Sequence, residues 1–216
     1  MRTEAPNQNK PLINRILLVG AGGHGKVVAD ALQLSAEADQ LYFVDDRESL
    51  SGHVLLGVQV LGSLSANLSS GDFVHVAIGQ NLVRRRIIEG IRSDQLRTVL
   101  HPSALVSRYA KVGSGSFVAA GAVLAPCSAL GVGVIVNHGA VVDHDCYVGD
   151  YCHVAPLASL AGGVRLEPGV LVGAGARILP GINIGADAVI GAGAVVRQDV
   201  ASGDTVVGVP ARRVFK

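Results

Sequence analysis

Aliphatic residues recur at every sixth position from Val106 to Val196, without a single insertion. These sixteen positions hold only Val, Leu or Ile, and the positions four residues later, from Ala110 to Val200, hold only Ala, Ser, Cys, Val or Ile. An amphipathic helix would show an apolar spacing of about 3.6 and a half-buried strand a spacing of about 2, so neither explains the pattern. A hexapeptide period predicts a parallel β-helix.

Each six-residue unit should supply one short strand and one corner, with the aliphatic and the residue four positions later pointing inward. Three units would complete a coil, and successive coils would be hydrogen-bonded roughly 4.8 Å apart. Corners favour Gly, Asn and Asp, and such residues often follow the aliphatic directly, as at Gly113 and Gly173. The same register places Cys146 and Cys152 inside and Cys127 outside. A β-sandwich of short strands does not account for this regularity.

The residues before the repeat alternate between compact apolar runs and helical patterns. Apolar runs at 15–20, 41–46, 58–61 and 72–79 predict strands, and the stretch after the first run and the segment 81–91 predict helices, the latter with a basic face. Strands that alternate with helices predict a small, parallel, Rossmann-like α/β domain. We therefore expect a disordered tail over 1–14, an α/β domain over 15–99 and a β-helix domain over 100–216.

A glycine loop joins the first predicted strand to the first predicted helix. Gly20, Gly22 and Gly25 fit the dinucleotide fingerprint, and Asp45 follows at the expected distance, at the end of the next strand. Unhindered backbone N–H groups at a helix N-terminus suit a diphosphate, and Asp45 or Asp46 could accept hydrogen bonds from a ribose or a base. A tight turn without a ligand and an NAD site are the alternatives. The small size of the sheet favours a sugar nucleotide over NAD.

Composition narrows the classes of function. The formal net charge is +1 and charged residues make up 16%, which gives no support for nucleic-acid binding. No apolar run is long enough to span a bilayer, and the N-terminal residues lack the apolar centre of a signal peptide. Three cysteines without metal-ligand spacing fit a reducing compartment, so we expect a cytoplasmic protein that needs no membrane partner.

The segment 137–156 gathers five residues that can carry chemistry: His138, Asp143, His144, Asp145 and His153. The register places His144 two residues after an inward Val, on the outer side of a strand, with Asp145 able to bend back to its imidazole. A neutral imidazole oriented by a carboxylate is a competent general base. A metal site, a solvated face and a subunit contact are the alternatives.

One coil above His144, the register places Gly162 between two other small residues, Ala161 and Gly163. We expect this gap to leave space for a ligand beside the imidazole.

Several motifs together carry a resemblance to a known family. GAGGHGKVV, the FVDD strand end, VAIGQN, the hexapeptides, GAVVDHDCYVG and the terminal GVPA resemble the nucleotide-sugar N-acetyltransferases of the bacillosamine and perosamine pathways, with the related sialic-acid O-acetyltransferases. The resemblance covers residues 15–212. It implies a left-handed β-helix, acetyl-CoA as co-substrate without a metal, and a homotrimer with active sites between neighbouring prisms.

The resemblance also assigns roles to residues. It makes His144 the general base, Asp145 the carboxylate that raises its basicity, and His153 a residue that helps to hold acetyl-CoA. Further acetyl-CoA contacts would lie near Gly162, Ala174 and Pro180. The nucleotide site maps to Gly22, Gly23, His24, Asp45, Asp46 and Gly79, and Gly22 stands where some relatives have Ser.

The expected function is acetyl-CoA-dependent acetylation of the 4-amino group of a nucleotide-linked 4-amino-4,6-dideoxy sugar. A sugar O-acetyltransferase of the sialic-acid type would use the same catalytic residues on a hydroxyl acceptor. A non-catalytic sugar-nucleotide-binding protein would have the same cavity without the chemistry. The sequence leaves uridine, guanosine and thymidine nucleotides open.

Overall fold

The computed structural model describes residues 15–35 and 40–214, so the tail predicted over 1–14 lies outside the described residues. The N-terminal part is a sheet with the strand order β3-β4-β2-β1-β5, parallel except for the β3–β4 hairpin. Its strands are β1 (Ile16–Val19), β2 (Leu41–Val44), β3 (Val54–Leu55), β4 (Val58–Leu61) and β5 (Phe73–Val76). The helices are α1 (Gly23–Leu34), α2 (Leu64–Asn67) and α3 (Asn81–Glu89), with 3-10 turns at Glu48–Leu50 and Ser93–Gln95. The α/β interpretation is confirmed.

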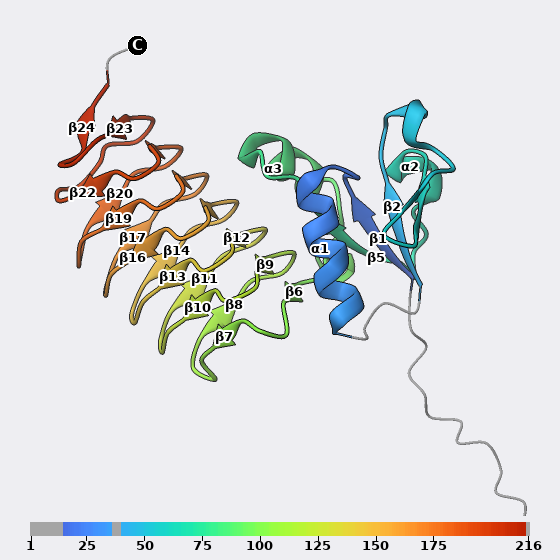
Figure 1. Cartoon of the computed structure of the whole chain (residues 1–216), viewed down its shortest axis with the longest axis horizontal. Helices are drawn as coiled ribbons and strands as arrows, with labels where there is room; N and C mark the ends of the chain where they lie inside the picture. The colour runs from blue at the N-terminus through green and yellow to red at the C-terminus, as the bar shows by residue number, and fades with distance from the viewer. Residues whose placement is uncertain (1–14, 36–39, 215–216) are drawn as a thin grey trace, which may run out of the picture.

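The rest of the described chain is a stack of coils with three parallel sheets, one on each face of a prism (Figure 1). The first face holds β6 (Val99–Leu100), β9 (Phe117–Val118), β12 (Ile135–Val136), β15 (His153–Val154), β18 (Leu171–Val172), β21 (Val189–Ile190), β23 (Thr205–Val207) and the antiparallel β24 (Arg212–Arg213). The second face holds β7 (Leu105–Val106), β10 (Val123–Leu124), β13 (Val141–Val142), β16 (Ser159–Leu160), β19 (Arg177–Ile178) and β22 (Val195–Val196). The third face holds β8 (Lys111–Val112), β11 (Ala129–Leu130), β14 (Tyr147–Val148), β17 (Arg165–Leu166) and β20 (Asn183–Ile184).

The inward register predicted from the six-residue period is confirmed. Strands pair with partners eighteen residues away, as Val123 does with Val141. Every predicted aliphatic is buried except Val106 and Val112, which stay half-buried because β7 and β8 are the edge strands of their sheets. Cys146 and Cys152 are buried among the aliphatics, whereas Cys127 is exposed.

The corner residues serve two different purposes. The residue with left-handed backbone is the third after each aliphatic, recurring every six positions from Gly115 to Gly193. The glycines directly after the aliphatics are needed for space, because a Cβ on Gly173 would lie 2.6 Å from the backbone nitrogen of Ala192 in the next coil. The expectation that corner conformation explains these directly following glycines was therefore wrong: close approach of the next coil explains them.

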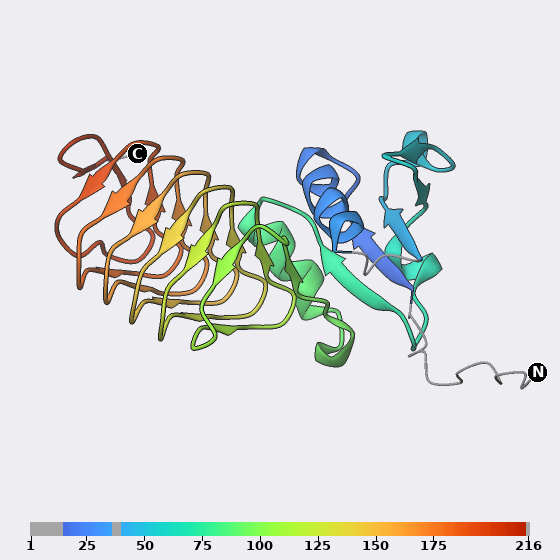
Figure 2. The ribbon, with the colours of Figure 1, turned by 60° about the horizontal axis from the view of Figure 1, so that its bottom comes forward.

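The α/β part packs against the first face of the prism near its N-terminal coils (Figures 1 and 2). Phe117 and Ile135 on this face share an apolar cluster with the buried side of α1, where Val28 and Leu32 stand one helical turn apart. Within the described residues, no helix is both long and apolar enough to cross a bilayer.

Arg84 holds the two parts together from within. The sequence placed it on a basic helix face, but its side chain is fully buried at the junction. It donates hydrogen bonds to six acceptors, none of them a carboxylate: the backbone oxygens of Ile78, Gly79, Gly133, Tyr151 and Cys152, and Oδ1 of Asn81. Burial lowers the pKa of the guanidinium to about 10. The helix therefore presents Arg85 and Arg86 to solvent, while Arg84 fixes the α/β part to the coils.

Candidate active site

The pair of side chains best suited to general-base catalysis is His144 with Asp145. It lies in the turn between β13 and β14 rather than on a strand. Nδ1 of His144 is 2.7 Å from Oδ2 of Asp145. The turn makes this possible because Asp145 adopts a left-handed backbone, with φ +59°, and so bends back toward its neighbour. Asp143 supports the turn by accepting the backbone N–H of His144 at 2.7 Å. The predicted pairing of His144 with Asp145 is present, although its position on the outside of a strand was wrong.

The two carboxylates prepare the imidazole as a base. Since a carboxylate can only accept, Nδ1 of His144 carries the proton and Nε2 has a free lone pair. The hydrogen bond to Asp145, followed by the charge of Asp143, raises the pKa of His144 above its ordinary value. The side chains of His144 and Asp145 are 62% and 66% exposed, so substrate atoms can reach Nε2.

Gly162 lies directly against this imidazole. A Cβ on Gly162 would be 2.5 Å from both Cε1 and Nε2 of His144. The sequence predicted that the small residues here leave room for a ligand, but the space beside Gly162 is filled by the imidazole itself. The absence of a side chain at 162 therefore allows the ring to lie against the next coil.

His153 occupies a different side of the prism, on strand β15 of the first face. Its Nδ1 is 3.3 Å from the carbonyl oxygen of Gly79, and its Nε2 is 3.1 Å from Nδ2 of Asn137. The Gly79 carbonyl can only accept, so Nδ1 donates and Nε2 accepts from the amide. Burial lowers the pKa of His153 to about 4, which keeps the ring neutral. Sequence reasoning missed Asn137, because it stands out only through this contact.

His24 brings the glycine loop to the same place. Its ring centroid lies 6.5 Å from that of His153 and 5.5 Å from that of Phe117. Burial lowers the pKa of His24 to about 3, and its buried Nε2 has no hydrogen-bond partner among the described residues. The predicted nucleotide residues His24 and Gly79 thus meet the predicted acetyl-CoA residue His153 at the domain junction.

A cavity of about 350 Å³ opens beside this junction, at the carboxyl ends of β1, β2 and β5. Five of the six predicted nucleotide residues line it: Gly22, Gly23, His24, Asp45 and Gly79. Asp46, the sixth, lines an adjoining cavity of about 560 Å³ together with Asp45. No atom lies within 4 Å of a Cβ built on Gly22, so the Ser of some relatives would fit there without rearrangement.

Arg47 also lines the smaller cavity and was not predicted from the sequence. Its Nε and Nη2 each lie 2.8 Å from the Asp45 carboxylate. The hydrogen bonds from Arg47 hold the pKa of Asp45 well below its usual range. No pattern in the sequence singles out Arg47, since only the folded loop brings it to the cavity.

The coils separate His144 from His153. The turn of His144 joins the second and third faces, so it lies at the corner opposite the first face, and the buried aliphatics of the prism stand between the two histidines. Gly162 and Pro180 stack above His144 at this corner, with Gly163 N bonded to His144 O and Gly181 N to Gly162 O. We call this column of turns the His144 corner. Ala174 lies at another corner, between the first and second faces.

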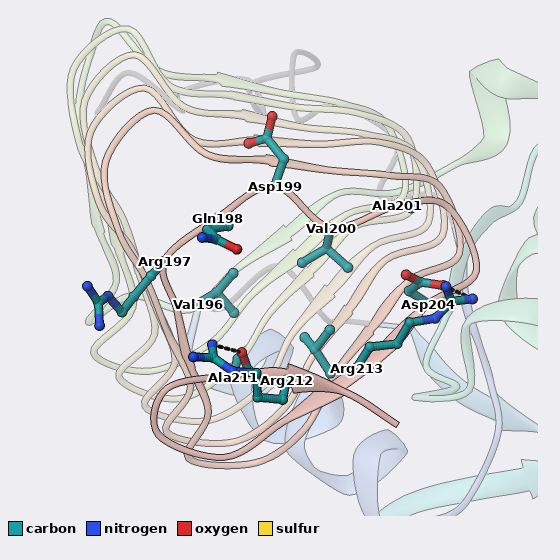
Figure 3. Close-up of a pocket in the computed structure, with 11 residues that line it drawn as sticks. Val196, Arg197, Gln198, Asp199, Val200, Ala201, Asp204, Ala211, Arg212 and Arg213 are labelled. Atoms are coloured by element: carbon teal, nitrogen blue, oxygen red, sulfur yellow. Dashed lines mark hydrogen bonds and ion pairs between the residues drawn. The ribbon is translucent and has the colours of Figure 1, made fainter. Parts of the chain in front are cut away.

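The His144 corner leads to a third cavity, of about 350 Å³, at the C-terminal end of the prism (Figure 3). Arg197 and Gln198 at the top of the corner line it, opposite Asp204, which pairs with Arg213 at 2.8 Å. Across the described ranges, no group of three or more His, Cys, Asp or Glu side chains is placed to hold a metal ion.

Comparison with protein families gives two matches. The PglD N-terminal domain matches residues 15–91, and the bacterial transferase hexapeptide, a model of six repeats, matches residues 163–198. Among curated proteins, UDP-N-acetylbacillosamine N-acetyltransferase of Bacillus subtilis (strain 168) is 34% identical over 113 residues, which cover 50% of this chain and 52% of that protein. The matched stretch thus spans about half the length of this curated relative.

Solved structures match over nearly the whole chain. The acetyltransferase domain of PglB from Neisseria gonorrhoeae FA1090, in complex with acetyl coenzyme A, has a TM-score of 0.87 and 39% identity, covering 93% of this chain and 100% of that chain. A mutant of perosamine N-acetyltransferase from Caulobacter crescentus, in complex with CoA and GDP-perosamine, has a TM-score of 0.87 and 36% identity. The match covers 94% of this chain and 98% of that chain.

A small α/β domain on a left-handed β-helix of hexapeptides, with an exposed His–Asp pair at one corner, defines a hexapeptide-repeat acetyltransferase. The matched relatives define the family within this class more closely. The chain belongs to the family of nucleotide-sugar N-acetyltransferases of the bacillosamine and perosamine type.

Proposed function

We propose that this protein transfers acetyl from acetyl-CoA to the 4-amino group of a nucleotide-linked 4-amino-4,6-dideoxy sugar, with His144 as the general base. The observation that carries the proposal is the 2.7 Å contact between His144 and Asp145, which leaves Nε2 as a free base on the surface. The relatives add the chemistry, since they are N-acetyltransferases and include complexes with acetyl-CoA and with GDP-perosamine.

In the proposed reaction the amine nitrogen attacks the thioester carbonyl carbon and a C–N bond forms. Nε2 of His144 takes the proton that the amine loses, and Asp145 holds Nδ1–H and stabilises the resulting imidazolium. A backbone N–H is the usual donor for the negative oxygen of the tetrahedral intermediate. When the C–S bond breaks, His144 returns the proton to the thiolate of CoA, so the products are the amide and CoA.

Two sides of the prism have to cooperate for this reaction. The predicted nucleotide residues meet His153 on the first face, whereas His144, Gly162 and Pro180 lie at the opposite corner. One chain cannot bring these groups to one substrate, because the buried core lies between them. A second copy that sets its His144 corner against the first face would complete the site, which supports the expected homotrimer with three shared sites.

The His144 corner offers a path for the co-substrate. Ala161, Gly163 and Gly181 carry a methyl group or no side chain, so little would obstruct a co-substrate lying alongside the imidazole at this corner. Arg197 and Gln198 stand three coils above His144, which is roughly 14 Å at the usual strand spacing. With the thioester at His144, the diphosphate of CoA would reach the exposed Arg197.

The first experiment measures acetyl transfer with a panel of amino-sugar and hydroxyl acceptors bearing UDP, GDP or dTDP. We expect acetylation of a 4-amino acceptor, and His144→Ala should lower kcat by about 10²-fold or more with the fold retained. His138→Ala is the comparison variant, because His138 is the other exposed histidine in the segment 137–156, and a larger loss there than in His144→Ala would identify His138 as the base. Acetylation of hydroxyl acceptors alone would instead identify an O-acetyltransferase, and unchanged kcat in His144→Ala would refute the base.

A complementation experiment tests the shared site. His144→Ala and His153→Ala chains, carrying different tags, are co-expressed and the mixed assemblies are purified. If each site takes His144 from one chain and His153 from another, one of the three interfaces in each mixed trimer is intact and activity reappears. Mixed assemblies as inactive as the two parents would contradict a shared site.

A further inference from the structure

The cavity beside the glycine loop favours an anion. Gly22 and Gly23 have no side chains to cover their N–H groups, and α1 begins at Gly23 with no acidic residue in its first turn. The N-terminus of a twelve-residue helix carries a partial positive charge, which attracts phosphate groups. The charged side chains that line this cavity together with the loop are Asp45 and Arg47, so they determine whether the cavity can hold an anion.

The Asp45 carboxylate has no free acceptor position. Its Oδ2 accepts from the backbone of Ala21 at 2.9 Å and from Nη2 of Arg47 at 2.8 Å. Its Oδ1 accepts from the backbone N–H of Arg47 at 3.1 Å and from Nε of Arg47 at 2.8 Å. The Asp45 side chain is only 10% exposed. In this arrangement Asp45 connects the glycine loop to Arg47 and has no oxygen left for a ribose hydroxyl.

The guanidinium of Arg47 has hydrogen-bond donors that Asp45 does not use. A guanidinium has five N–H groups, and Asp45 takes only Nε–H and one N–H of Nη2. The other three N–H groups have no acceptor among the described residues, and the side chain is 59% exposed at the rim of the cavity. The two-point contact with Asp45 restricts the rotamers of Arg47, so binding a second anion costs less side-chain entropy.

We propose that Arg47 binds the diphosphate of the nucleotide-linked substrate, and that Asp45 is a positioning residue that holds Arg47 against the glycine loop. The diphosphate would lie between the N–H groups of Gly22 and Gly23 and the free N–H groups of Arg47. Asp46, at the adjoining cavity, then remains the carboxylate available to the nucleoside. This inference rests on the proposed function and adds a residue that the family resemblance does not supply.

Calorimetric titration of the full chain with UDP, GDP and dTDP, and with the three matching nucleosides, tests the assignment. Arg47→Ala should weaken binding of the preferred diphosphate by about tenfold or more, since it removes charge-assisted hydrogen bonds to the phosphate oxygens. Binding of the matching nucleoside should stay unchanged. Arg47→Lys should recover part of the loss, because it restores the charge without the two-point contact.

Arg92→Ala is the matched control. Arg92 makes the same two-point contact with a carboxylate two residues away, Asp94, at 3.0 and 2.6 Å, and it does not line the cavity. Its removal should leave diphosphate binding unaltered. Equal weakening of diphosphate and nucleoside, or no weakening of either, would overturn the role of Arg47, as would a wild-type protein that binds none of the three diphosphates.

Steady-state kinetics separate this inference from the proposed function. With Arg47→Ala, KM for the nucleotide-linked acceptor should rise while kcat at saturation and KM for acetyl-CoA stay near the wild-type values. A wild-type protein that binds diphosphates through Arg47 but acetylates no acceptor would refute the acetyl transfer alone. An active enzyme whose KM for the nucleotide-linked acceptor is unchanged by Arg47→Ala would refute the diphosphate contact alone.

Discussion

Gly162→Ala is the sharpest perturbation of the proposed base, because it adds one methyl group against the imidazole. The new Cβ would lie 2.5 Å from Cε1 and Nε2 of His144 and 3.2 Å from Nδ1, whereas ordinary contacts begin at 3.4 Å. The ring must therefore retreat by about 1 Å. The backbone does not resist the change, since Gly162 is not among the residues with left-handed φ.

The cost should fall on catalysis and spare the fold. The imidazole is 62% exposed and can swing into solvent, so we expect a change in unfolding free energy of about 0.5 kcal/mol or less. A misplacement of about 1 Å can cost about 10²-fold in rate, so kcat/KM should fall by that order. Retreat also lengthens the bond to Asp145 that raises the pKa of His144, so the acidic limb of kcat/KM should move to lower pH.

Thermal unfolding and a pH series of kcat/KM measure both effects. Gly193→Ala serves as the opposite case, because Gly193 has φ +68° and no atom within 4 Å of its added Cβ. That variant should lose about 1 kcal/mol of stability and keep its kcat. If Gly162→Ala retains normal kcat and the same acidic limb, either the ring position or the role of His144 as base is wrong.

Four further outcomes follow from the structure. Asp145→Asn removes the carboxylate that raises the pKa of His144; because activity is lost as pH falls through that pKa, the acidic limb should shift to lower pH, with a smaller loss of kcat than in His144→Ala. Val172→Asp places an unpaired charge at a fully buried position, which should cost several kcal/mol and unfold the prism in a circular-dichroism melt, and a stable variant would contradict the inward register. Arg84→Met leaves six acceptors without their donor, so calorimetry should show a lower transition or separate melting of the two parts, and Arg84→Lys should not restore it because three N–H groups cannot serve six acceptors. Arg197→Ala should raise KM for acetyl-CoA and not for acetyl-pantetheine, which lacks the diphosphate. Equal effects on both would refute a contact between Arg197 and the diphosphate of CoA.

The sequence by itself determined the prism and its register. Each hexapeptide meets the same environment as the unit eighteen residues away, so a local period is enough to predict which side chains point inward. The pairing of His144 with Asp145 was also predictable, because neighbours in a turn need no distant part of the chain to meet. The glycine loop followed the same logic, since its strand, turn and helix are consecutive.

Only the tertiary structure decided which side of the prism each group serves. Arg84 reads as one of three consecutive arginines on a helix, yet six acceptors from residues 78–152 surround it at the junction. From the sequence, Gly162 was predicted to leave space for a ligand, yet the imidazole of His144 from the preceding coil fills that space. Arg47 reads as an ordinary loop residue until Asp45 holds it at the cavity. These roles arise from contacts between residues far apart in the chain or from the exact path of a loop, and neither leaves a periodic signal.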